Sequence, residues 1–184
     1  MSTQPLEMAS AAAREALSGT GADQMSASTP CSSWDVAALI NHIVGAQSFF
    51  AAGLTGTPPA GETDYAAGDY VAAFDEASAA LVSAFGAEGA LEKMYELPFG
   101  TMPGSAFMGL ATTDTFQHAW DLAKATGQNT DINPELAAGI LAQSKMAISE
   151  SFRGGEGSPF GAEQQAPEGA SNADQLAAFL GRTV

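Results

Sequence analysis

Apolar residues recur at helical spacing along most of the chain, and breaks rich in proline and glycine divide them into segments. The spacing predicts long helices over residues 5–17, 34–54, 65–85 and 105–126, another over 134–151 and a short one over 171–180. Residues 92–99 are expected to be extended, because Pro98 and Gly100 interrupt any helix there. Four long helices, with a loop about the length of a surface crossover after the first, predict an all-α four-helix bundle with short extra helices.

Several expected helix ends carry residues that favour capping. Ser33 is a good N-cap for the second helix, and Asp35 is favourable in its first turn. Pro134 suits the first turn of the helix that it opens, and Gly127 suits the position just after the 105–126 helix. These signals fix where the helices are expected to begin and end.

The segment 105–126 carries an unusual polar stripe. Asp114, His118 and Asp121 fall at positions i, i+4 and i+7, so they lie along one side of the helix. The rest of this helix is apolar nearly all round, which predicts burial. Ionisable side chains on a buried helix are costly unless each finds a partner. A metal ion could satisfy an aspartate and a histidine together, and the alternative is a hydrogen-bonded cluster that holds helices in register.

The second helix carries one histidine outside its main apolar face. That face is formed by Val36, Ile40, Ile43, Val44, Gln47 and Phe50. His42 falls about 120° from its centre. Spacing alone is typical of a flank residue that touches solvent, or of a core group with satisfied hydrogen bonds.

Composition narrows the class of protein. The chain has 184 residues, 46% of them hydrophobic, which suits one domain over residues 1–184 with a sizeable core. The net charge of −15 argues against binding to nucleic acid and to anionic membrane surfaces, which need basic patches. No window approaches about 18 consecutive apolar residues, so no membrane span is expected.

Cys31 is the only cysteine, so no intrachain disulfide can form, which fits a reducing compartment. The N-terminal residues lack the basic start and long apolar core of a signal peptide, and a cytoplasmic location is therefore expected. Cys31 lies just before the second helix, where a helix N-terminus can activate a thiol. A lone cysteine is more often a small packed hydrophobic residue.

Four aromatic residues are candidates for the walls of a core or pocket. Trp34 and Trp120 are expected to pack rather than react, and Phe49 and Tyr95 are candidates to line a substrate pocket. The chain contains no nucleophilic serine motif, P-loop or dinucleotide-binding fingerprint.

Two motifs together resemble a known family. The segment TPCSSWDVAALINHIVG at residues 29–45 resembles the opening of the actinobacterial proteins related to mycothiol-dependent maleylpyruvate isomerase. The segment DTFQHAWDLAKATGQ at residues 114–128 resembles their D-x-x-x-H-x-W-D-L-A-x-A-T-G stretch, and the tail at 160–182 is also similar. The wider group is the DinB/YfiT-like four-helix superfamily, so the resemblance implies a DinB-like bundle.

The resemblance also implies a metal site. Members of the family are similar in using three ligands for a divalent metal, which correspond here to His42, Asp114 and His118. Asp121 lies one turn beyond His118 and could accept its free ring N–H. Two imidazoles and a carboxylate leave positions open for water or substrate, as in catalytic zinc sites. Zinc fits thiol chemistry best, with nickel or iron as alternatives.

The implied activity is metal-dependent transfer of a small thiol, mycothiol or another low-molecular-weight thiol, to a small electrophile. The isomerase branch has a glutamate where this chain has Asp114, which alters the reach of the carboxylate. The isomerase also carries a second, C-terminal domain, for which 184 residues leave no room. Isomerisation of maleylpyruvate is therefore not expected.

Two further interpretations stay open. A bundle that keeps the fold but performs no chemistry would be a metal- or ligand-binding protein of stress or detoxification, and the scarcity of basic residues motivates it: the chain has six in all. A homodimer whose interface completes the site is the other, since acidic four-helix proteins of this kind often self-associate.

Overall fold

The computed structural model describes residues 2–57, 61, 63–149, 152–154 and 160–184. Its described helices are α1 (Gln4–Ser18), η1 (Ala22–Gln24), α2 (Val36–Thr55), η2 (Tyr65–Ala67), α3 (Tyr70–Gly86), α4 (Gly104–Thr126), α5 (Pro134–Ala147) and α6 (Asn172–Phe179). Two short strands, β1 (Met94–Leu97) and β2 (Gly100–Pro103), pair in antiparallel register. The prediction of an all-α bundle with short additions is confirmed.

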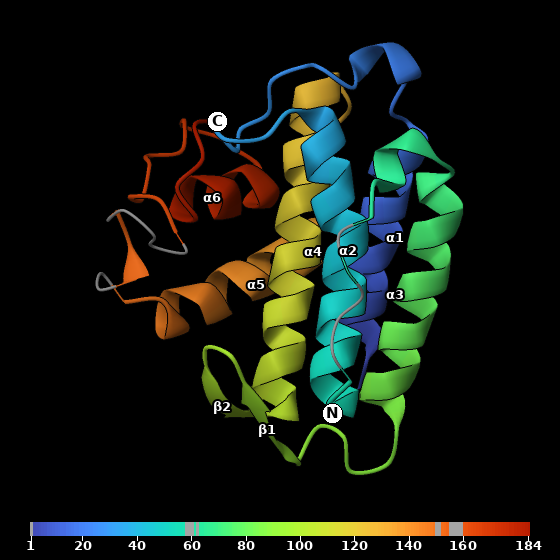
Figure 1. Ribbon diagram of the computed structural model, residues 1–184. Coiled ribbons are helices and arrows are strands. Elements are labelled where there is room, and N and C mark those ends of the chain that lie inside the picture. Colours follow the sequence, from blue (N-terminus) through green and yellow to red (C-terminus); the bar gives the residue numbers. More distant parts are fainter. Residues whose placement is uncertain (1, 58–60, 62, 150–151, 155–159) are drawn as a thin grey trace.

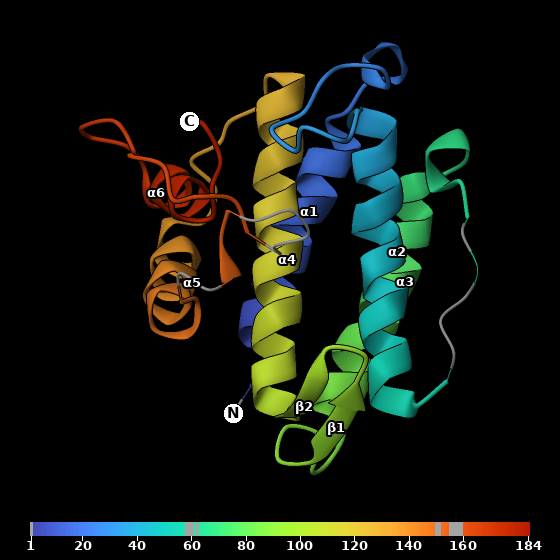
Figure 2. The ribbon, with the colours of Figure 1, turned by 60° about the vertical axis from the view of Figure 1, so that its left-hand side comes forward.

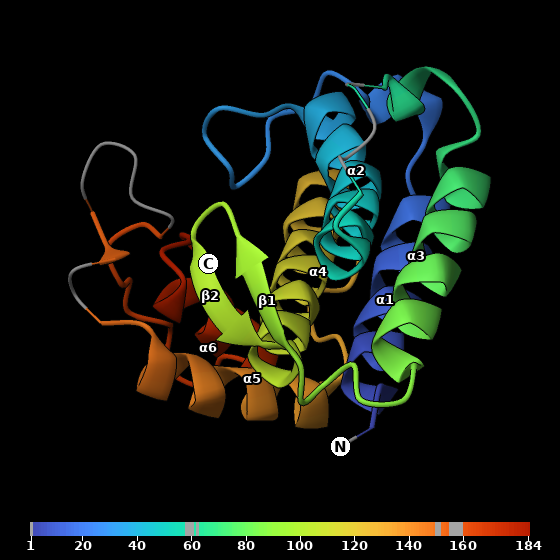
Figure 3. The same ribbon diagram turned by 60° about the horizontal axis from the view of Figure 1, so that its bottom comes forward.

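Helices α1 to α4 form the bundle, in which α4 packs against α1 and α2, and α3 packs against the same two helices on the side away from α4 (Figures 1 and 2). Helices α2 and α3 begin at the same end of the bundle, so they run in the same direction (Figure 1). The β1–β2 hairpin lies at the end where α4 begins (Figures 1 and 3). This arrangement places α2 and α4 side by side along one seam.

The core fills both ends of the bundle. One cluster joins α1, α2, α3, α4 and β1 through large side chains that include Phe50, Leu81, Phe85 and Phe107. A second cluster, towards the other end, joins the four long helices and includes Leu39, Ile43, Phe74 and Leu122. The predicted main face of the second helix is buried throughout. Both α2 and α4 are therefore anchored by a core cluster towards each end of the bundle.

Helices α5 and α6 pack outside the bundle against α4 (Figure 2). Trp120 of α4 is fully buried at this contact, and its ring N–H donates to Asp174 of α6 at 2.8 Å. The prediction that Trp120 packs in the core is confirmed. The outer helices therefore bring the C-terminal residues close to α4.

Some predicted boundaries need correction. The N-cap of α2 is Asp35 rather than Ser33, because the Asp35 carboxylate accepts the backbone N–H of Ala38. The third helix begins at Tyr70 rather than at residue 65, where a short 3₁₀ turn precedes the capping residue Asp69. The fifth helix ends at Ala147, short of the predicted residue 151, which lies outside the described residues.

The second strand was not predicted, although the extended segment before it was. Residues 100–103 pair with 94–97 and turn the expected single extended stretch into a hairpin. Of the described helices, α2 alone is long and apolar enough to meet a length and composition test for a membrane span. Nine of its residues are buried inside the bundle, as expected for a core helix.

Candidate metal centre

The polar stripe of α4 is largely buried. Asp121 has no exposed surface, and 9% of His118 is exposed. The Asp114 side chain retains 27% exposure and lies nearest the surface. Asp114 and His118 face α2, and Asp121 faces the loop before α2 and the C-terminal segment. Trp120 and Phe116 pack against α5 and α6. The sequence prediction that the stripe lies on a buried helix therefore holds.

His42 of α2 meets this stripe. Its Nε2 lies 3.4 Å from Oδ1 of Asp114, and Nε2 of His118 lies 3.6 Å from the same oxygen. One ligand atom from each of the three residues lies within 4.8 Å of the others. The structure thus brings together the three residues that the resemblance assigned as ligands.

Hydrogen bonding does not satisfy this cluster. The His42–Asp114 contact is long for a hydrogen bond, and the His118–Asp114 contact exceeds the usual limit. Oδ2 of Asp114 is buried and has no hydrogen-bond partner among the residues that the structure describes. A buried carboxylate oxygen without a partner is costly. Ligand atoms around tetrahedral zinc lie about 3.3 Å apart, given bonds of about 2.0–2.1 Å, so the observed spacing and the orphaned oxygen both fit a metal ion.

Asp121 fixes the orientation of His118. Nδ1 of His118 donates to Oδ2 of Asp121 at 2.9 Å, because an ionised carboxylate can only accept. The other ring nitrogen, Nε2, then faces Asp114 and His42. A hydrogen-bonded carboxylate behind a histidine ligand is common in metal sites and sets which nitrogen is available. The geometry that the sequence suggested for Asp121 is present.

Arg182 approaches Asp121 from the C-terminal segment. Its Nε donates to Oδ1 at 3.1 Å, and its Nη2 donates to Oδ2 at 2.9 Å. Gln117 adds a third donor, at 3.3 Å from Oδ1. Burial by itself would raise the pKa of Asp121, but the hydrogen bonds from His118 and Arg182 hold it at about 2. Asp121 is therefore an anion at any physiological pH.

The charges of the cluster are strongly coupled. Burial would lower the pKa of His118, but the hydrogen bonds with Asp121 and Cys31 and the charge of Asp114 raise it to about 10. Burial would likewise raise the pKa of Asp114, yet the hydrogen bond with His42 and the charge of His118 keep it below its usual value. In the metal-free protein His118 is therefore a cation between two carboxylates.

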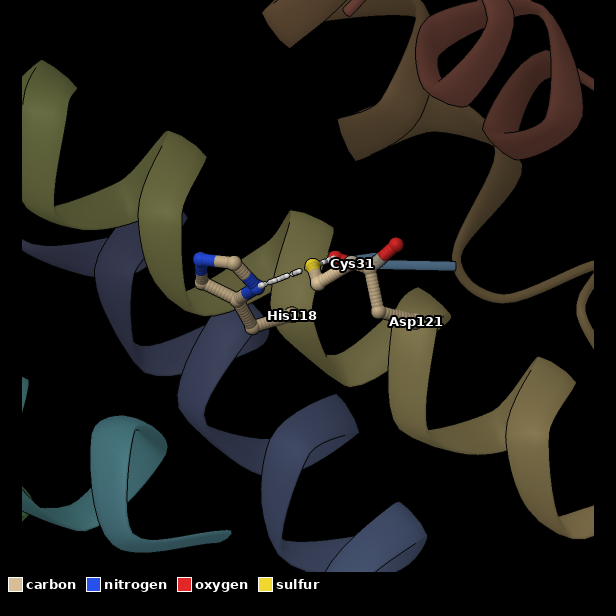
Figure 4. A group of neighbouring side chains, drawn as sticks. All are labelled: Cys31, His118 and Asp121. Carbon is tan, nitrogen blue, oxygen red and sulfur yellow. Dashed lines mark hydrogen bonds and ion pairs between the residues drawn. The ribbon is translucent and has the colours of Figure 1, made fainter. Parts of the chain in front are cut away.

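Cys31 belongs to the same cluster, on the Asp121 side (Figure 4). Its Sγ lies 3.3 Å from Oδ2 of Asp121, 4.0 Å from Nδ1 of His118 and 3.5 Å from Nη2 of Arg182. The thiol is half-buried and forms no disulfide. Sequence reasoning favoured a packed hydrophobic residue here, whereas the structure shows a thiol that donates to a buried carboxylate.

Trp34 covers the two histidines. Its ring centroid lies 4.5 Å from that of His42 and 5.5 Å from that of His118. A cavity of about 690 Å³ opens beside it. The cavity is lined by Trp34, Ala38, Asn41, His42, Gly45, Ser48, Phe49, Gly61, Thr63, Asp64 and Tyr65. The predicted roles of Trp34 and Phe49 as pocket walls agree with this lining.

Tyr95 lies elsewhere. It is 7% exposed in the core cluster at the hairpin end, with its ring centroid 6.3 Å from that of Phe107. A second cavity of about 430 Å³ extends from His42 and Asp114 towards Phe49 and Phe50, and Tyr95 is not among its lining residues either. Tyr95 therefore packs inward from β1 and lines neither of these two cavities, and its role in a substrate pocket stays a prediction.

Fold and site together define a helical-bundle protein with a His–Asp–His cluster at the seam of two helices. The family model of the mycothiol maleylpyruvate isomerase N-terminal domain matches residues 6–123, and the chain belongs to that family. Two uncharacterised proteins of Mycobacterium tuberculosis, from two strains, are each 44% identical to it over 170 residues, covering 91% of this chain and 90% of the relative. Comparison with solved structures gave no significant match.

Sequence reasoning missed one residue of this cluster. Arg182 was counted only among the few cations of the chain, and no spacing argument linked it to residue 121, which is 61 positions away. The available signal was the likeness of the tail, which ends on this arginine.

Proposed function

We propose that the protein binds a divalent metal, most suitably zinc, through His42, Asp114 and His118, and uses it to transfer a small thiol of the mycothiol type to a small electrophile. The observation that carries the proposal is that Nε2 of His42 and Nε2 of His118 lie 3.4 and 3.6 Å from Oδ1 of Asp114, whose Oδ2 is buried without a hydrogen-bond partner among the described residues. The family, which is named for a mycothiol-dependent reaction, supports the choice of thiol.

The residues divide the work. His42, Asp114 and His118 would hold the ion, and a bound divalent ion would lower the pKa of a coordinated thiol and keep its thiolate available. Asp121 keeps the proton on Nδ1 of His118 and leaves Nε2 for the site. The Trp34 ring shields both imidazoles on one side. Substrates would enter from the open cavity on the His42 side.

The cavity suits an uncharged, hydroxyl-rich thiol such as mycothiol. Among the described residues that line the cavity, none is a lysine or arginine and one, Asp64, is acidic. Asn41, Ser48 and Thr63 offer amide and hydroxyl groups, while Tyr65 offers a ring face. In the transfer, the thiolate sulfur forms a bond to carbon, and the electrophile either expels a leaving group or takes up the proton that the thiol gave up.

A conjugation assay tests the proposal. Purified protein loaded with zinc is incubated with mycothiol and a panel of small electrophiles, before and after removal of metal by a chelator. We expect turnover that disappears with the chelator, returns with zinc and is absent in His42→Ala. Zinc binding without turnover over a broad panel would leave a non-catalytic binding protein, and absence of zinc binding would overturn the whole proposal.

A further inference from the structure

Arg182 makes a two-pronged contact with a carboxylate that has no exposed surface. Its Nε and Nη2 address different oxygens of Asp121, at 3.1 and 2.9 Å. Such bidentate pairs fix the plane of a carboxylate as well as its position. Among the described residues, the other donor to Oδ1 of Asp121 is the side-chain amide of Gln117, at 3.3 Å. Arg182 therefore sets the rotation of the Asp121 side chain.

Arg182 is itself held firmly at the end of α6. Its backbone N–H donates to the carbonyl of Ala177 at 2.9 Å, and the preceding Gly181 takes φ +96°, which closes the helix. The backbone of Gly161 passes so close to Gly181 that a β-carbon there would clash. The bond from Trp120 to Asp174 ties the same helix to α4. These contacts fix the backbone at Arg182 relative to α4 and so place its guanidinium beside that helix.

We infer that Arg182 is a positioning residue for the His–Asp–His site. It holds Asp121 so that Oδ2 meets Nδ1 of His118, and the imidazole is thereby aimed with Nε2 towards Asp114 and His42. The inference rests on the proposed function for its metal readout. It also extends the site beyond the region that the family model matches, residues 6–123, into the segment that carries α5 and α6.

Substitution of the arginine tests this directly. Arg182→Gln keeps a donor but loses the fork, and Arg182→Lys keeps the charge as a single point. The matched control is Arg153→Gln. Arg153 is 9% exposed, donates to the carbonyl of Phe179 at 2.7 Å and lies over the Phe179 ring, so it also secures the end of α6. No contact between Arg153 and Asp121 occurs among the described interactions.

Zinc affinity, measured by competition with a chromophoric chelator, is the first readout. Loss of a hydrogen-bonded partner behind a histidine ligand weakens metal binding by about 10- to 100-fold. Because Arg182 acts one contact further away, we expect about 10-fold weaker binding in Arg182→Gln, a smaller loss in Arg182→Lys, and little change in Arg153→Gln. Equal weakening by both glutamine variants would show a merely structural role and overturn the inference, as would wild-type affinity in Arg182→Gln.

The second readout needs no metal. The proton that His118 Nδ1 shares with Asp121 should give a downfield, slowly exchanging resonance in the NMR spectrum of the metal-free protein. We expect this resonance to move or broaden in Arg182→Gln and to persist in Arg153→Gln. If the wild type binds no zinc, the proposed function fails, and this resonance alone decides the role of Arg182: an unchanged signal in Arg182→Gln overturns it.

Discussion

Substitution of Asp114 by asparagine separates the metal interpretation from a simple polar cluster. The change keeps the size of the side chain but removes the only negative ligand among the three residues that converge at the seam. It also neutralises a carboxylate whose Oδ2 is buried without a partner in the metal-free protein. Because the depressed pKa of Asp114 means that its charge stabilises the metal-free fold at neutral pH, we expect Asp114→Asn to fold with a somewhat lower melting temperature than wild type in the absence of zinc. We also expect it to respond much less when zinc is added.

The size of the effect follows from linkage. Zinc at about 1,000 times its dissociation constant stabilises a protein by about 4.1 kcal/mol. For a chain of 184 residues, 1 kcal/mol shifts the melting temperature by roughly 2–4 °C, so the wild type should gain roughly 8–16 °C. A loss of affinity of about 100-fold leaves a ratio of about 10, about 1.4 kcal/mol and roughly 3–6 °C.

Differential scanning fluorimetry with and without zinc measures these shifts. The control is Asp75→Asn, which makes the same change of charge at an exposed ion pair with Arg14. Its zinc response should match that of wild type. An undiminished zinc shift in Asp114→Asn, or a wild type that does not respond to zinc at all, would refute the reasoning.

Three further changes test the surroundings of the cluster. The pKa of His118 is about 10 in the metal-free protein, so zinc must displace the proton on its Nε2. Zinc binding should therefore release a proton near neutral pH, and the affinity should rise from pH 6 to 9. Calorimetry in buffers of different ionisation enthalpy measures this proton release, and binding heats that do not depend on the buffer would contradict it. Trp34→Ala removes the half-buried ring over His42 and should lower stability by roughly 1–3 kcal/mol in urea denaturation, and also weaken binding of the thiol. Gly127→Ala forces a side chain to φ +72° at the end of α4 and should lower stability by about 1 kcal/mol with zinc affinity unchanged, so a changed affinity would show that this end communicates with the site.

The main features of the bundle follow from local pattern. Apolar periodicity is a property of each helix alone, which is why the long helices and the buried stripe of α4 could be predicted. Pro134 and Gly127 act through their own backbone, and both hold their predicted positions in the structure. The convergence of residue 42 with residues 114 and 118 needed the resemblance, because helical spacing says nothing about which helices become neighbours.

The errors in the predicted helix starts and in the strand region arise where contacts other than the apolar period set the structure. The backbone N–H of Val36 donates to the carbonyl of Ala27, so the preceding loop supplies the bond that an earlier helix start would have provided. Tyr65 belongs to a separate turn because Asp69 caps α3 and the intervening Gly68 is extended. Successive side chains of β1 point to opposite faces of the strand, so the face that is buried could not be predicted without knowing that β1 pairs with β2. The burial of Tyr95 follows from that pairing. The start of α2 and the burial of Tyr95 depend on pairing with a neighbouring segment, whereas the start of α3 is set by a local cap, in which the Asp69 carboxylate accepts the backbone N–H of Ala72.

The division of the cluster between α2 and α4 gives it a mechanical meaning. An ion held by one side chain from α2 and two from α4 would act as a staple across the seam, so the helices could part only after it left. Amide hydrogen exchange along the facing turns of these helices would then slow as the fraction of protein with bound metal increases. The exchange rate of these amides would therefore report the metal occupancy of the site.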